Sequence, residues 1–158
     1  MMWTNESAFN ALCKGTPEER AEAIKFLGDA AYAPSVPVLA ELVEDSDPGT
    51  RFLAAQALGK IGDEAESAVN SLLIGLRADD MYLRMAITGA LIAIGRPAVG
   101  GLVRALFDNK AAVRRASAKA LGRIGDRETI KPLTVALKDA DAGVRKFAEE
   151  AISRLQTA

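Results

Sequence analysis

The chain has 158 residues, of which 49% are hydrophobic but only 5% aromatic, and its formal net charge is −1. It is long enough to bury the core of one domain. Its apolar content is mostly Ala, Leu, Ile and Val, which favours closely packed helices over a β-sandwich. Histidine is absent, which removes the commonest general base and the commonest metal ligand.

The composition also excludes several locations. No apolar run approaches the about 20 residues of a membrane-spanning helix, and the first residues lack the basic and apolar regions of a secretory signal. Cys13 is the only cysteine, so an internal disulfide is impossible. Together these features predict a cytoplasmic protein that does not enter a membrane.

Five arginines recur at intervals of 31, 33, 30 and 31 residues and set the register of an internal repeat: Arg20, Arg51, Arg84, Arg114 and Arg145. Other positions repeat with them. Seven residues after each Arg stand Leu27, Leu58, Leu91, Leu121 and Ile152. Six after it stand Phe26, Ala57, Ala90, Ala120 and Ala151, and twelve before it stand Ala8, Leu39, Leu72, Leu102 and Leu133. Such spacing indicates two amphipathic helices in each repeat.

In chain order, the predicted helix pairs span residues 5–31, 34–62, 65–95, 97–125 and 127–157. Four second helices have a good N-cap residue four positions before the Arg: Thr16, Asp47, Asp80 and Asp141. Thr16 and Glu19 predict a capping box. The fourth repeat has Lys110 at the cap position, although Asn109 could cap one residue earlier. Three second helices are expected to end at a left-handed glycine: Gly62, Gly95 and Gly125.

The motif VRRASAKALGRIGD at residues 113–126, with its copies at 50–63 and 83–96, resembles the HEAT-like repeats first associated with phycobilisome lyases. The resemblance covers residues 5–157 and implies an all-α fold, an α-solenoid (superhelix) of five HEAT-like helix pairs in one domain, 1–158. It also implies that the register arginines pair with aspartates of neighbouring repeats. The matching positions are Asp45, Asp108 and Asp139, and Ala78 predicts a gap in the third repeat.

No catalytic constellation is predicted. Without histidine, a Ser-His-Asp or Cys-His pair cannot form, and Cys13 is interpreted as a small packing residue. The glycines lie at helix ends with repeat spacing rather than in a phosphate-binding loop. The sequence therefore predicts no catalytic residue, no cofactor and no metal site.

The predicted function depends on the surface of the second helices, which is expected to line the concave face. An apolar centre is expected from Phe52, Gln56, Tyr82, Met85, Gly89 and Ile92. A basic flank is expected from Arg115, Lys119, Arg123 and Lys146. Together they predict a groove for a partner protein. The sequence leaves open whether Phe52, Met85 and Ile92 are exposed or pack against adjacent helices.

Charge is distributed unevenly along the chain. Residues 1–80 contain 14 acidic and 6 basic side chains, and residues 81–158 contain 7 acidic and 14 basic ones. The acidic and basic halves could associate head to tail, or the basic half could meet an acidic partner. The sequence does not determine the oligomeric state, although polar terminal helices argue against end-to-end stacking.

Three functions remain in consideration. The favoured one is a non-enzymatic scaffold for another protein, whose identity the sequence does not reveal. The family resemblance implies an alternative, a subunit of a bilin lyase or isomerase. Nucleic-acid binding is disfavoured, because Trp3 is the only tryptophan and the chain as a whole is not basic.

Overall fold

The computed structural model describes residues 2–157, which form ten α-helices and four short 3₁₀ helices. The first helices of the five pairs are α1 (Asn5–Lys14), α3 (Val36–Leu42), α5 (Val69–Gly75), α7 (Val99–Ala105) and α9 (Ile130–Ala136). The second helices are α2 (Pro17–Asp29), α4 (Pro48–Ile61), α6 (Met81–Ile94), α8 (Ala111–Ile124) and α10 (Ala142–Thr157). The 3₁₀ helices η1 (Ala33–Ser35), η2 (Gly62–Ala68), η3 (Arg96–Ala98) and η4 (Arg127–Thr129) lead into pairs two to five.

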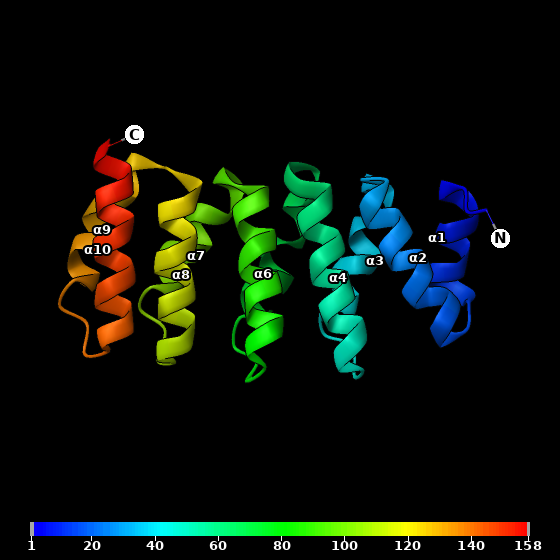
Figure 1. The fold of residues 1–158 in the computed structure, drawn as a ribbon, viewed down its shortest axis with the longest axis horizontal. Coiled ribbons are helices and arrows are strands. Elements are labelled where there is room, and N and C mark those ends of the chain that lie inside the picture. The colour runs from blue at the N-terminus through cyan, green and yellow to red at the C-terminus, as the bar shows by residue number, and fades with distance from the viewer. Residues whose placement is uncertain (1, 158) are drawn as a thin grey trace.

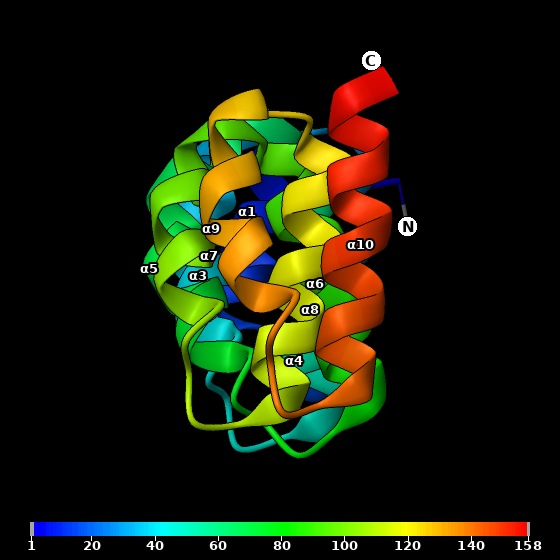
Figure 2. The same cartoon turned by 90° about the vertical axis from the view of Figure 1, so that its left-hand side faces the viewer.

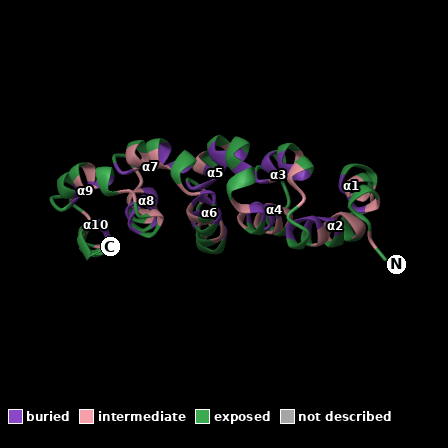
Figure 3. Cartoon of the chain, turned by 90° about the horizontal axis from the view of Figure 1, so that it is seen from above, coloured by how far each residue is buried: buried purple, intermediate pink, exposed green. Residues whose placement is uncertain are grey.

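The helix pairs stand side by side in chain order, so that the two termini lie at opposite ends of one row (Figure 1). Viewed along the row, the first and second helices form two separate layers (Figure 2). The row bows gently, and the second helices lie on the inside of the curve (Figure 3). This architecture confirms the predicted all-α solenoid of five helix pairs.

The ends of the second helices follow from the residues predicted to define them. Thr16 accepts a hydrogen bond from the Glu19 backbone N–H at 3.2 Å, and the Glu19 carboxylate accepts one from the Thr16 backbone N–H at 2.8 Å. This confirms the capping box. Asp47, Asp80 and Asp141 also accept backbone N–H groups. Lys110 gives no side-chain cap, and Asn109 instead accepts from Arg77.

The core lies between the two layers and along the row. The leucines seven residues after each register arginine, from Leu27 to Leu121, are fully buried, and so are the first-helix leucines twelve residues before it, Leu39, Leu72, Leu102 and Leu133. Alanines such as Ala57 and Ala151 are nearly as well buried and allow neighbouring second helices to approach closely. Each helix therefore gains its stability by packing against adjacent pairs rather than from its own length.

The register arginines bind mainly within their own repeat. From the second repeat on, each donates from Nη1 to the backbone carbonyl six residues earlier, as Arg114 does to Asp108 at 2.8 Å. Of the expected pairs between repeats, only Arg114 with Asp139 is formed. Asp108 pairs with Arg77 instead, and Asp45 accepts from the Asp47 backbone N–H.

Among residues 2–157, no single helix combines the length and apolar character that crossing a bilayer requires. Helix α6 and the segment Arg96–Ala105 reach that length and apolar character only when taken together, and they are bent by 118° relative to each other.

Cys13 is exposed on α1, so its interpretation as a packing residue was wrong. It follows the buried Leu12 in a helix, where one further residue turns the side chain away from the core.

Candidate partner-binding groove

Neighbouring second helices are brought close by a column of glycines eight residues after the register arginine. A Cβ atom added at Gly28 would lie 2.8 Å from the Ala57 Cα, and one added at Gly122 would lie 2.7 Å from the Ala151 Cα. Real Cβ atoms do not approach so closely. The α2–α4 and α8–α10 interfaces therefore depend on having no side chain at these positions.

The third repeat breaks this column, because Ile92 stands where the first, second and fourth repeats have Gly28, Gly59 and Gly122. A branched side chain does not fit between second helices that approach as closely as they do at the glycine positions. Ile92 is half-buried against the core, and α6 contacts α8 less closely than α8 contacts α10. The α6–α8 interface is consequently open on the face of the second helices.

A groove of about 470 Å³ lies at this open interface. From α6 it is lined by Met81, Arg84, Met85, Thr88, Gly89 and Ile92, from α8 by Ala112, Arg115, Ala116, Lys119 and Arg123, and from α10 by Phe147. The lining is largely apolar, and Met85 is 59% exposed. We call this set of residues the α6–α8 groove.

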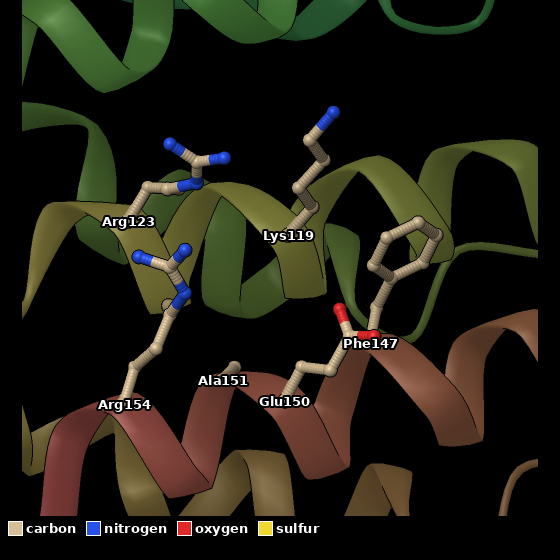
Figure 4. A pocket seen from close by; sticks show the side chains of 7 residues that line it. Lys119, Arg123, Phe147, Glu150, Ala151 and Arg154 are labelled. Atoms are coloured by element: carbon tan, nitrogen blue, oxygen red, sulfur yellow. The ribbon is translucent and has the colours of Figure 1, made fainter. Parts of the chain in front are cut away.

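A smaller cavity of about 190 Å³ continues the groove between α8 and α10. It is lined by Lys119, Gly122, Arg123, Phe147, Glu150, Ala151 and Arg154, and we call it the cationic cavity. Arg154 reaches from α10 toward Arg123 on α8, while Glu150 lies beside Phe147 (Figure 4). Because Lys119, Arg123 and Phe147 line both cavities, the two form one continuous surface.

The cations of this surface differ in how they are held. Arg84 donates to the Ala78 carbonyl at 2.6 Å, and the Arg115 Nε lies 3.0 Å from the Asp141 carboxylate. Within residues 2–157, no carboxylate lies within ion-pair distance of Lys119, Arg123 or Arg154. The charge of the cationic cavity is therefore available to an anion from outside the chain.

The opposite edge of the α8–α10 interface is closed by an ion pair. Arg114 binds Asp139 through Nε at 2.8 Å and Nη2 at 2.9 Å. The Arg114 guanidinium lowers the pKa of the Asp139 carboxyl below its ordinary value, and Asp139 in turn raises the pKa of Arg114. This bidentate pair ties the last two repeats together.

Six of the ten predicted binding residues line the α6–α8 groove: Met85, Gly89, Ile92, Arg115, Lys119 and Arg123. Tyr82 and Lys146 are exposed nearby but outside both cavities, and Gln56 lines a shallow depression between α4 and α6. Of the three apolar residues whose exposure was open, Met85 is exposed, whereas Phe52 and Ile92 are half-buried.

Sequence reasoning missed other lining residues. Phe147, two residues after Arg145, was not among the predicted binding residues, and Arg84 was expected only to set the register of the repeats. The signal that could have found them is the interrupted glycine column. Where isoleucine replaces glycine, the two neighbouring helices cannot approach closely, so the side chains around that interface are the ones left accessible.

The described residues also show no site for a metal ion. Within residues 2–157 there is no group of three or more His, Cys, Asp or Glu side chains that could hold a metal ion. Together, the α6–α8 groove and the cationic cavity offer an apolar surface beside Lys119, Arg123 and Arg154, which suits binding of an amphipathic anion.

Comparisons with known proteins agree with the architecture, which is that of an α-solenoid presenting a binding face. A sequence model of HEAT repeats matches residues 6–92 and 69–153. The chain belongs to the HEAT-repeat family.

Two relatives connect this family with phycobiliproteins. The chain is 32% identical over 146 residues to an uncharacterized phycocyanin operon protein Z of Pseudanabaena tenuis, covering 87% of this chain and 72% of the relative. It is 29% identical over 117 residues to phycocyanobilin lyase subunit alpha of Picosynechococcus sp., covering 74% of this chain. The aligned part is only 35% of the lyase subunit.

Solved structures share the fold. The complex of CpcE and CpcF of phycocyanin lyase from Nostoc sp. PCC7120 gives a TM-score of 0.70 at 24% identity, covering 100% of this chain and 67% of that one. A designed armadillo repeat protein in complex with the peptide (KR)4 gives a TM-score of 0.61 at 17% identity, covering 94% and 80%.

Proposed function

We propose that the chain is a non-enzymatic scaffold that binds a partner protein on the face formed by its second helices. The observation that carries the proposal is the α6–α8 groove, whose volume of about 470 Å³ exceeds that of the openings between α4 and α6, about 290 Å³, and between α8 and α10, about 190 Å³. A concave apolar surface with a few convergent charges is the usual form of a binding site.

The chemistry of the groove suits protein recognition. Met81 and Met85 are more than half exposed, and their unbranched, polarisable side chains adapt to different apolar partners. Phe147 and Ile92 provide firmer surface beside them. The designed armadillo repeat protein of related fold binds a peptide, which supports the same use of a solenoid face here.

The proposal can be tested by site-specific photo-crosslinking in an extract of the native organism. A photoreactive amino acid replaces Met85 in one sample and Val135, which is equally exposed on α9, in a matched control. A discrete protein adduct formed from position 85 and absent from position 135 is the expected result. Equal adducts from both positions, or none from either, would assign the groove no binding role.

A second candidate is a subunit of a bilin lyase, which the relationship to phycocyanobilin lyase subunit alpha favours. A linear tetrapyrrole is an elongated apolar molecule with carboxylate side chains. Its rings would suit Met85 and Phe147, and its carboxylates would suit Lys119 and Arg123. The chain's own residues would then hold and orient the pigment while a protein acceptor approached.

Absorbance spectroscopy separates the two candidates. A linear tetrapyrrole is added to the purified chain and to a Met85→Ser variant. The scaffold function predicts the same spectrum with and without protein. A shifted, sharpened absorbance band that the Met85→Ser substitution removes would instead favour pigment binding in the α6–α8 groove.

A further inference from the structure

Building on the function proposed above, we infer that the groove binds an acidic segment of a partner protein, with an apolar side chain placed close to its carboxylates. The inference concerns the chemistry of the partner rather than the existence of a partner. It follows from the continuity of two cavities with different linings.

The first part of the surface requires an apolar side chain. Met81, Met85 and Ile92 present thioether and hydrocarbon surface. The polar groups among them are already engaged, since the Thr88 hydroxyl donates to the Arg84 carbonyl at 2.6 Å. Placing a polar group here would cost free energy because it would find no partner, whereas an aliphatic or aromatic group would be stabilised by leaving water.

The second part requires negative charge. Lys119, Arg123 and Arg154 line the cationic cavity, and none of them has an ion-pair partner among residues 2–157. Glu150 is the only carboxylate in that lining. Adjacent unpaired cations repel one another, and an incoming carboxylate relieves that repulsion while forming charge-assisted hydrogen bonds. Arg115 shows the contrast, because Asp141 already neutralises it.

The two requirements apply to a single ligand. Lys119, Arg123 and Phe147 belong to both linings, so the apolar anchor and the carboxylates must be close together in the ligand. A protein segment with acidic residues beside a leucine or phenylalanine meets this condition in a few consecutive residues or in one turn of helix.

The charge of the rest of the chain argues against a long polyanion. Residues 1–80 have 14 acidic and 6 basic side chains, so a nucleic acid extending along the row from the cationic cavity would meet increasing repulsion. Stacked bases also need several aromatic side chains, whereas Phe147 is the only aromatic residue that lines the two cavities.

Fluorescence anisotropy with synthetic peptides tests the inference. The probe is a fluorescein-labelled peptide in which a Leu-Leu pair is followed by Asp and Glu residues. Two matched peptides carry Ser in place of Leu or Lys in place of the acids. The protein variants are Met85→Ser and the double charge reversal Lys119→Glu with Arg123→Glu. The control is Arg104→Glu with Lys138→Glu, which makes the same charge change at exposed positions of the other layer.

The acidic peptide is expected to bind the native chain at least about tenfold more tightly than either matched peptide, a difference of about 1.4 kcal/mol. Its affinity should fall by a similar factor in both groove variants, and added salt should weaken it. The control reversal should bind within about twofold of the native chain. Thermal melts establish that every variant is folded.

Several results would overturn the inference. One is an acidic peptide that does not bind, or that binds no more tightly than the Lys peptide. An oligothymidylate that binds more tightly, in a way that Lys119→Glu with Arg123→Glu abolishes, would point to nucleic acid. Self-association in sedimentation experiments, abolished by the same substitutions, would point to a second copy. In each case, crosslinking from position 85 still tests the scaffold function separately, because it does not depend on the charge of the partner.

Discussion

The α6–α8 and α8–α10 interfaces are neighbours built from equivalent positions of the same repeat, yet their second helices pack differently. At the α8–α10 interface Gly122 meets Ala151 so tightly that a Cβ atom has no room, Arg114 binds Asp139, and the cavity between the helices measures only about 190 Å³. At the more open α6–α8 interface Ile92 occupies the glycine position, and a groove of about 470 Å³ lies beside it. In this solenoid, the residue at one position of the repeat therefore governs how wide an opening neighbouring second helices leave.

The hydrophobic core is common to both interfaces, so its loss should affect them equally. Leu91 and Leu121 are fully buried at equivalent positions of α6 and α8. Replacing either with Ala should create a cavity and lower the free energy of unfolding by about 2–5 kcal/mol. Urea denaturation measures both changes, with the exposed Lys119→Ala as a control expected within about 0.5 kcal/mol. A much smaller loss for Leu91→Ala would indicate that the open interface lacks a packed core.

The glycine column should distinguish the interfaces. Gly122→Ala places a methyl group against the Ala151 backbone and should cost about 1–3 kcal/mol as the helices are forced apart. Gly89→Ala is the comparison in α6: Gly89 lies outside the glycine column, and no atom beyond its own helix lies within 4 Å of the new Cβ. It should raise stability by about 0.5–1 kcal/mol, because alanine is the better helix former. Thermal melts compare the two, and opposite signs are expected.

The Arg114–Asp139 ion pair should contribute measurably, unlike the exposed pair of Lys60 with Asp29. At neutral pH, Asp139→Asn should cost about 1–3 kcal/mol, whereas Asp29→Asn should change stability by no more than about 0.5 kcal/mol. Denaturation curves of both variants test this difference. If both variants lost the same stability, burial would not strengthen the Arg114–Asp139 ion pair.

The same ion pair predicts a pH dependence. Hydrogen bonding from Arg114 lowers the pKa of Asp139 in the folded chain below its ordinary value of 3.8. The pair therefore stabilises the fold above that pH, and the contribution is lost as the pH falls through the lower folded pKa. The stability difference between the native chain and Asp139→Asn should shrink over this acidic range. If this stability difference stayed constant as the pH falls, the substitution would act by changing the packing rather than the ion pair.

The helix pairs, their caps and the buried columns could be predicted from sequence because each depends on local periodicity. Leu91 and Thr16 are defined by residues three or four positions away, so the pattern predicts their environment. The same reasoning found Met85 and Lys119 as surface residues of the second helices.

The limits of that reasoning concern contacts between repeats. Whether Arg84 meets Asp108, or Phe147 reaches a cavity shared with α6, depends on the separation of helices that belong to different repeats. A helical projection of one repeat has no information on that separation. Only the comparison of equivalent positions, with Ile92 in place of glycine, indicates which pair of helices is held apart.

The most direct test of this account is a crystal structure of the Ile92→Gly variant beside that of the native chain. If the isoleucine holds the interface open, α6 and α8 should approach as closely as α8 and α10, and the groove should largely disappear while the other interfaces stay unchanged. An unaltered separation of α6 and α8, with the groove intact around the new glycine, would contradict the account and place the cause of the opening elsewhere in the repeat.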